Sequence, residues 1–245
     1  MKKAYLFMAL FLALATPAFA QEPEPDDEKT EKNAITFINP DRGGAFYLLL
    51  GTSSPDVDSL NQRLETAGYS KLSQNFTTVG FGGHAILDKW VVGGEIQGLA
   101  EKSSATSTYR TRVNGGYLLV NVGYTVYEKP SLRVFPQAGL GFGTLNLSIN
   151  ETSSPTFDQT LADPKRGAAL VNSSMLLNLG IAADGIIAPP ESGKGGFWVF
   201  GFRAGYLFTI YQDGWRNIEG ASSGGPSAGF TGPYLQVVLG GGFYN

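Results

Sequence analysis

Eight stretches of this sequence have the alternation of β-strands, and the gaps between them alternate between long and short. The long polar gaps lie near 53–73, 101–109, 150–169 and 212–231, and the short gaps lie at 88–89, 128–131 and 187–195. A β-meander that crosses a membrane repeatedly has long loops on one side and tight turns on the other. The gap pattern therefore predicts an all-β chain, folded as an eight-stranded antiparallel up-and-down transmembrane barrel.

Several of the expected strands are long. They cover residues 44–52, 75–87, 90–100, 110–127, 132–149, 170–186, 196–211 and 232–244. Strands of soluble sheets usually have about 5–6 residues. The greater length favours strands that cross a bilayer over the strands of an exported β-sandwich.

Alternation along the strands separates an apolar face from a polar one. In the seventh strand Trp198, Phe200 and Phe202 share one face, and Gly201 and Arg203 share the other. The polar faces hold mostly Gly, Asn and Ser with single charges, whereas a water-exposed face of a sandwich is usually rich in Lys and Glu. Apolar-out and polar-in is the pattern of outer-membrane strands.

The N-terminus has the features of a secretory signal. Lys2 and Lys3 precede an apolar segment over 6–15, and Ala18-Phe19-Ala20 is a cleavage site, so we expect cleavage after Ala20. The apolar segment is shorter than the ~20 residues that a membrane anchor needs. The expected organisation is a signal peptide over 1–20, a disordered acidic periplasmic leader over 21–42 and a barrel over 43–245.

Composition excludes several classes of protein. The chain has no cysteine, so it has neither disulfides nor thiolate metal sites. Without the signal it has 16 basic and 21 acidic residues and no basic run, which argues against nucleic acid as a partner. Its 33 glycines follow no collagen period and suit strands that bend around a narrow barrel.

The first long gap predicts a short helix. Ser53 and Asp56 have the spacing of a capping box, and Gly68 is a plausible stop. The apolar positions between them follow helical spacing at Val57, Leu60 and Leu64. An amphipathic helix in an external loop can cap the barrel mouth or contact a ligand, and the apolar stripe favours capping.

Strand parity places a set of polar side chains inside the barrel. They are His84, Glu95, Gln97, Asn121, Asn178 and Arg203. An eight-stranded barrel is just wide enough for side chains to fill it, and a buried charge must be paired. We therefore expect Glu95 and Arg203 to form a salt bridge that plugs the lumen. The alternative is a small or gated pore, in which rearrangement of this pair opens a proton or ion path.

Two further groups of residues are assigned by position. An aromatic girdle is expected where strands meet the short turns, formed by Trp90, Tyr127, Trp198, Phe243 and Tyr244. In the fourth long gap Trp215 stands beside Arg216. Such an aromatic–cation pair serves binding surfaces, although a tryptophan there can equally anchor a strand at the outer interface.

With eight expected strands, an export signal and abundant glycine, the chain resembles the small OmpA/OmpX-like outer-membrane β-barrels of Gram-negative bacteria. The segment 234–245 looks like their terminal signal, except that Phe243 and Tyr244 stand before a final Asn245. Phe81-Gly-Gly-His84 and Val92-Gly-Gly-Glu95 also resemble uncharacterised small outer-membrane proteins of Bacteroidota-type bacteria.

The resemblance implies location and partners. It implies a monomer in the outer membrane, surrounded by membrane lipids and lipopolysaccharide. It also implies recognition of the last strand by the barrel-insertion machinery. The expected role is non-enzymatic, either structural in the envelope or binding an extracellular ligand through the loops.

An enzymatic role is the least favoured one. A catalytic histidine needs a nucleophile and an orienting group, and His84 is the only histidine. Outer-membrane lipid A deacylases carry a His-x-Ser pair, whereas this chain has His84-Ala85-Ile86. We therefore expect no catalytic residues, no metal site and no cofactor.

Overall fold

A computed structural model describes residues 36–37, 41–129, 132–152, 156–162, 167–188, 195–217 and 225–244. These residues belong to one compact unit, which covers 34–245. The expected signal peptide over 1–20 and most of the expected leader over 21–42 lie outside the described residues.

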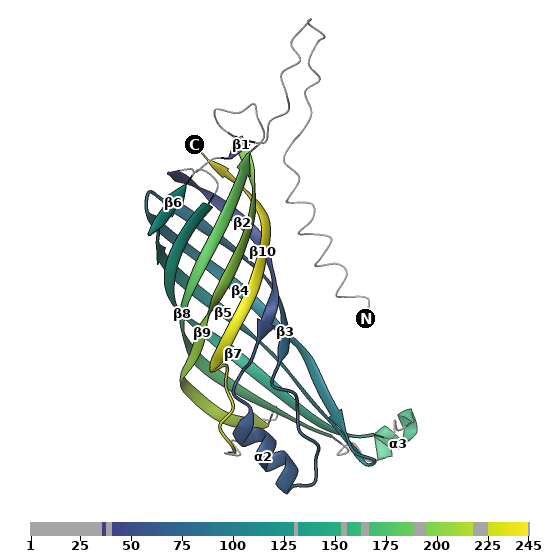
Figure 1. The fold of residues 1–245 in the computed structure, drawn as a ribbon. Coiled ribbons are helices and arrows are strands. Elements are labelled where there is room, and N and C mark those ends of the chain that lie inside the picture. Colours follow the sequence, from purple (N-terminus) through teal and green to yellow (C-terminus); the bar gives the residue numbers. More distant parts are fainter. Residues whose placement is uncertain are drawn as a thin grey trace, which may run out of the picture. The chain divides into compact units, whose positions relative to one another are not determined.

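Eight long antiparallel strands form a closed ring (Figure 1). They are β2 (Arg42–Ser53), β3 (Phe76–Leu87), β4 (Trp90–Ala105), β5 (Tyr109–Tyr124), β7 (Leu132–Glu151), β8 (Gly167–Ala188), β9 (Gly195–Asn217) and β10 (Gly232–Tyr244). Each strand pairs with the next, and β10 pairs with β2 from Tyr234↔Ser53 to Tyr244↔Gly43. The predicted eight-stranded up-and-down barrel is confirmed.

Two short strands lie at the end of the barrel with the tight turns. β1 (Thr36–Phe37) pairs with Ile187 and Ala188 at the end of β8, and β6 (Tyr127–Lys129) pairs with the start of β7. β1 and the first residue of β2 lie inside the range 21–42, for which the sequence predicted a disordered leader.

The strands extend further at the loop end than the sequence predicted. The expected long gap over 101–109 is wrong, because β4 continues to Ala105 and β5 begins at Tyr109. The two strands remain paired from Lys102↔Val113 to Ala105↔Arg110 after an irregularity that follows Leu99. Likewise β9 reaches Asn217, so the fourth gap does not begin at 212. Polar residues resemble a loop in the sequence, yet they suit a strand segment that lies beyond the bilayer.

The predicted loop helix is present as α2 (Asp58–Thr66). Its end is set by Gly68, whose φ of 83° is accessible to glycine, and the N–H of Tyr69 donates to the carbonyl of Leu64 at 2.8 Å. The predicted capping box is wrong, because Ser53 is the last residue of β2. The Oδ1 atom of Asp56 instead accepts from the N–H of Asp58 at 3.1 Å.

The sequence did not predict α3 (Phe157–Ala162), which lies between β7 and β8. Among the described residues, no helix is long and apolar enough to cross a membrane.

The outer face of the barrel is apolar over a defined height. On β9 this face runs from Trp198 to Ile210, with exposed aromatic rings such as Phe200 and Phe202 between them. Twelve residue steps of about 3.3 Å, at a tilt of about 45°, give about 28 Å, close to the ~25 Å apolar band of outer-membrane barrels. Beyond this band the outward residues of β5 become polar, with Asn114, Arg112 and Arg110.

Candidate functional site

An apolar cluster closes the lumen at the loop end. From α2 and its flanks, Val57, Leu60, Leu64 and Leu72 are buried against inward residues of the barrel wall. The residues from the barrel wall are Phe76, Leu99, Val113, Tyr117, Leu119, Leu145, Leu147, Leu176, Leu207 and Tyr234. The end of β9 adds Trp215, and the segment before β10 adds Ala228 and Phe230. The structure thus places α2 as a cap on the barrel mouth.

Trp215 is part of this cluster and does not form a binding surface. Its side chain is 2% exposed, and its Nε1 atom donates to the Pro226 carbonyl at 2.9 Å. Both sequence interpretations of Trp215 are wrong, because β9 extends past the predicted strand end and turns this ring inward. Arg216 is exposed and forms an ion pair with Asp213 at 3.2 Å.

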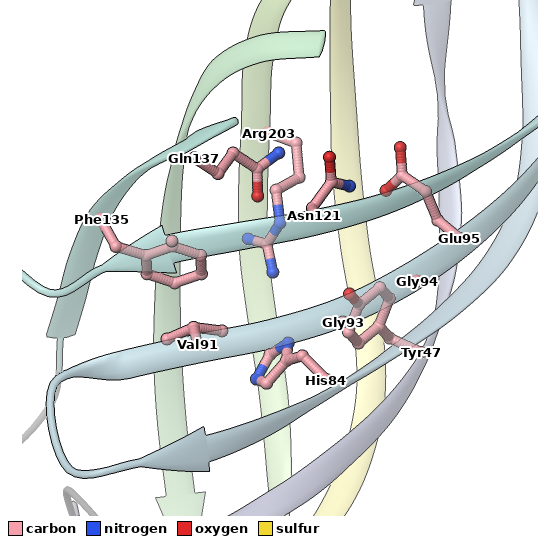
Figure 2. A pocket seen from close by; sticks show the side chains of 11 residues that line it. Tyr47, His84, Val91, Gly93, Gly94, Glu95, Asn121, Phe135, Gln137 and Arg203 are labelled. Atoms are coloured by element: carbon pink, nitrogen blue, oxygen red, sulfur yellow. The ribbon is translucent and has the colours of Figure 1, made fainter. Parts of the chain in front are cut away.

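The structure places all six sequence-predicted lumenal side chains inside the ring. Glu95, Gln97, Asn121, Asn178 and Arg203 are buried, and the side chain of His84 is 5% exposed. His84, Glu95, Asn121 and Arg203 lie around one cavity (Figure 2). Strand alternation brings them inside, since each occupies an inward position.

The partner of Arg203 is Asp184 of β8, and the predicted Arg203–Glu95 salt bridge is wrong. The guanidinium binds the carboxylate in two places, at 2.5 Å and 3.0 Å. In the β8–β9 ladder Asp184 pairs with Gly201, and Gly201 and Arg203 are successive inward residues of β9. The two charged side chains are therefore diagonal neighbours on the inner face. Glu95 lies on β4, which does not adjoin β9.

Aromatic rings enclose the Arg203–Asp184 pair. The guanidinium carbon of Arg203 lies 5.5 Å from the ring centre of Tyr47 and 5.3 Å from that of Phe135, within the range of cation–π contacts. His84 lies beside Tyr47 with ring centres 5.4 Å apart, and its Nε2 atom is 4.0 Å from Asp184. Tyr47 and Phe135 were not predicted as part of the lumenal network, although both occupy inward positions.

The cavity itself lies between this charge cluster and the middle of the lumen. It is lined by Glu95, Asn121, Gln137 and Arg203, among others. The cavity has room for about one water molecule at most. The Glu95 carboxylate is 5% exposed and has no direct hydrogen bond or ion pair with the described residues.

A chain of amide and phenol groups continues from the cavity toward the loop end. Asn178 donates to Asn121 at 2.8 Å, and the hydroxyl of Tyr234 donates to Asn178 at 2.9 Å. That hydroxyl fits because Gly180 and Gly205 face it, where an added Cβ would lie 2.7 Å and 2.6 Å away. The narrow lumen therefore holds large side chains over glycines of neighbouring strands.

A second buried arginine lies near the turns. Arg133 is 1% exposed and pairs with Glu128 at 2.6 Å. The predicted lumenal network included neither Arg133 nor Asp184, although strand parity puts both on the inward face of predicted strands.

The described lumen offers little for catalysis. The carboxylate nearest to His84 is Asp184, which is already bound in two places by Arg203. Within the described ranges, no group of three His, Cys, Asp or Glu side chains is placed to hold a metal ion. The cluster instead connects five strands across the lumen, because Tyr47, His84, Phe135, Asp184 and Arg203 lie on β2, β3, β7, β8 and β9.

Four of the predicted girdle residues lie on the outer surface near the turns. Trp90, Tyr127, Trp198 and Phe243 are exposed, whereas the side chain of Tyr244 lies outside the described residues. The ring of Trp90 packs edge-to-face on Tyr124 of the next strand, with centres 5.1 Å apart.

No protein-family model matches this chain, and no curated protein matches its sequence. Among solved structures, the chain is similar to Ail, the attachment invasion locus protein of Yersinia pestis, with a TM-score of 0.39 and 12% sequence identity. The alignment covers 84% of this chain and 99% of the Ail chain. A likeness of this degree says nothing about a role of this chain in attachment or invasion.

Proposed function

We propose that this chain is a non-enzymatic barrel of a Gram-negative outer membrane, which anchors a rigid loop end and presents it to the outside. The observation that carries the proposal is a closed ring with an apolar outer band and a filled lumen. In a bilayer only a closed sheet or a helix satisfies every backbone group, and the apolar band has the height for such a barrel.

The filled lumen argues against the alternative of a small pore. The apolar cluster under α2 covers the loop end, and the Arg203–Asp184 pair and its aromatic neighbours occupy the half near the turns. In a planar lipid bilayer we expect the refolded protein to give no single-channel steps above the leak of a protein-free membrane. Steps that change in Glu95→Gln or Arg203→Ala would support the pore instead.

The burial of His84 argues against the enzymatic alternative. A lipid-modifying enzyme needs its base at the membrane surface, and the His84 side chain faces the lumen among Tyr47, Phe135 and Asp184. Activity on lipid A that disappears in His84→Ala would contradict this part of the proposal.

The loop end is the part that could meet a ligand. A depression between α2 and the segment 71–74 is lined by polar side chains, including Asp58, Gln62 and Glu65. Its walls are fixed, because Asn61 forms hydrogen bonds of 3.0 Å and 2.8 Å with the backbone of Leu72. A preformed polar surface of this kind supports a binding role at the loop end.

The proposal includes the surroundings of the barrel. Membrane lipids and lipopolysaccharide would contact the outward apolar band, and the insertion machinery would bind β10, whose Leu235, Val237 and Leu239 face outward. The ring closes within one chain, which supports a monomer.

The orientation is testable because the chain contains no cysteine. Gln62→Cys places a single thiol on α2, and Lys89→Cys places one in the turn between β3 and β4. With a maleimide that does not cross membranes, we expect intact cells to label Gln62→Cys, and Lys89→Cys only after lysis. The reverse pattern would contradict presentation of the loop end.

A further inference from the structure

The helix α2 that caps the barrel has a second face, which is exposed. Its apolar side chains pack into the cluster that closes the mouth. Asp58, Gln62 and Glu65 follow one another at spacings of four and three residues, so they form one stripe along the helix. All three are exposed, and they line the depression between α2 and the segment 71–74. The second face of α2 is therefore one wall of an open site at the loop end.

The depression is large enough for a small ligand, and its floor is held in place. Its volume is about 380 Å³, and small-molecule sites usually have about 300–1,000 Å³. Two of its lining residues, Asn61 and Leu72, are buried, and the Asn61 amide is bonded to both the N–H and the carbonyl of Leu72. A surface that is already ordered loses little conformational entropy when a ligand binds, so the depression is preformed for binding.

A pair of side chains marks each end of the depression. At one end the amide of Gln74 donates to the Asp58 carboxylate, and at the other Lys71 pairs with Glu65 at 3.1 Å. Asp58 and Glu65 are seven residues apart, so the rise along the helix between them is about 10 Å. That length suits a ligand of a few linked rings better than a single ion.

The lining residues favour a ligand with hydroxyl groups. Six of the seven described residues that line the depression are polar or charged, whereas sites for drug-sized ligands are mainly apolar. Carboxylates only accept hydrogen bonds, an ammonium group only donates, and the amides of Gln62 and Gln74 do both. A hydroxyl group also donates and accepts, so neighbouring hydroxyls of one ligand can bond to all of these groups.

The charges of the depression favour an uncharged ligand. Asp58 and Glu65 carry two negative charges and Lys71 carries one positive charge, so one negative charge remains. This charge disfavours an anionic ligand, such as a phosphate or a sialylated sugar. A basic ligand would compete with Lys71 for Glu65. A neutral ligand with several hydroxyl groups meets neither difficulty.

We propose that this depression binds a short neutral saccharide. The carboxylates of Asp58 and Glu65 accept hydrogen bonds from its hydroxyls, the Gln62 amide bonds to the hydroxyls between them, and Lys71 donates from the opposite wall. The inference rests on the proposed function, because presentation of the loop end makes the depression accessible from outside, and it names the class of ligand.

The test uses the full chain refolded in a detergent without a sugar headgroup, since a glycoside detergent would compete for the site. A fluorescent label is attached at Lys89→Cys, in the turn at the other end of the barrel. The labelled protein is applied to an array of neutral oligosaccharides and their sialylated counterparts. We expect binding to neutral members of the array, with an affinity that is the same in low and high sodium chloride.

Two exposed positions of α2 provide matched variants. Gln62→Ala removes an amide that lines the depression, and we expect it to weaken binding of the best array saccharide about tenfold. Arg63→Ala removes a side chain of the same helix that is exposed and does not line the depression, and we expect unchanged affinity. Both changes are on the exposed side of α2, so neither disturbs the apolar cluster.

Three results would overturn the proposal: no binding to any neutral member of the array, equal affinity in Gln62→Ala and the unchanged chain, or a preference for sialylated members. These results are independent of orientation in the membrane, because the protein is purified. If intact cells label Gln62→Cys and the purified protein binds no saccharide, this inference fails and the proposed function stands. If Gln62→Cys is labelled only after lysis, the proposed function fails instead.

Discussion

The pair formed by Arg203 and Asp184 gives the sharpest prediction about the stability of the barrel. Arg203→Met keeps much of the side-chain volume and removes the charge. Asp184, with 2% of its surface exposed, then remains as a buried carboxylate without the two bonds of 2.5 Å and 3.0 Å. Removing one partner of a buried ion pair costs about 3–5 kcal/mol.

Two further contacts add to that cost. The guanidinium also loses its contacts with the rings of Tyr47 and Phe135, which contribute about 1–2 kcal/mol together in a desolvated site. Methionine regains part of this by packing on the same rings. We therefore expect Arg203→Met to lower the free energy of unfolding by about 4 kcal/mol, close to a thousandfold change in the equilibrium constant.

The double variant Arg203→Met with Asp184→Leu separates lost pairing from lost packing. A buried ion pair replaced by apolar residues of similar volume is often neutral or stabilising, so we expect the double variant to recover most of the loss. The assay is urea unfolding of the barrel refolded in detergent micelles, followed by tryptophan fluorescence and gel mobility. A loss below about 1 kcal/mol in Arg203→Met, or a double variant as unstable as the single one, would refute the reasoning.

Three further predictions concern the cap, the glycines of the lumen and the surface. Leu60→Glu should release α2 from the barrel mouth, because the side chain of Leu60 is buried in the apolar cluster. Limited proteolysis should therefore cleave the loop of this variant and leave the control Ser59→Glu intact, because Ser59 is exposed. Gly143→Ala should destabilise the barrel by about 1–3 kcal/mol in urea unfolding, because the new Cβ would lie 2.5 Å from the ring of Phe230. The control Gly98→Ala should be neutral, because its new Cβ would meet no atom closer than 3.6 Å. Arg216→Ala removes an exposed ion pair and should change the urea midpoint by less than the measurement error.

Most of the correct assignments of residues to the lumen came from strand parity. Side chains alternate with a period of two, so Glu95, Gln97 and Asn178 were assigned to the lumen once the strands were recognised. The same rule applied to Asp184, which also faces inward. Parity does not say which inward residues meet, because that depends on the register between strands. The register of β8 with β9 places Asp184 diagonally to Arg203, and no property of either residue alone fixes it.

The ends of the strands were harder to predict for a different reason. Within the bilayer the outward residues must be apolar, and that pattern is easy to recognise. Beyond it, β4 continues through Lys102, Ser103 and Ser104 with polar residues on both faces, so polarity no longer distinguishes a strand from a loop. The burial of Trp215 was missed for the same reason, since its environment depends on an extension that the sequence pattern does not mark.

Closure of the barrel within a membrane is the central claim, and gel mobility of the protein extracted from outer-membrane fractions tests it most directly. A closed sheet with every backbone group paired resists cold detergent. We expect the unheated protein to migrate faster than the boiled protein and to be found in the outer-membrane fraction. Identical mobility before and after boiling, with the protein soluble in the periplasm, would contradict the transmembrane barrel.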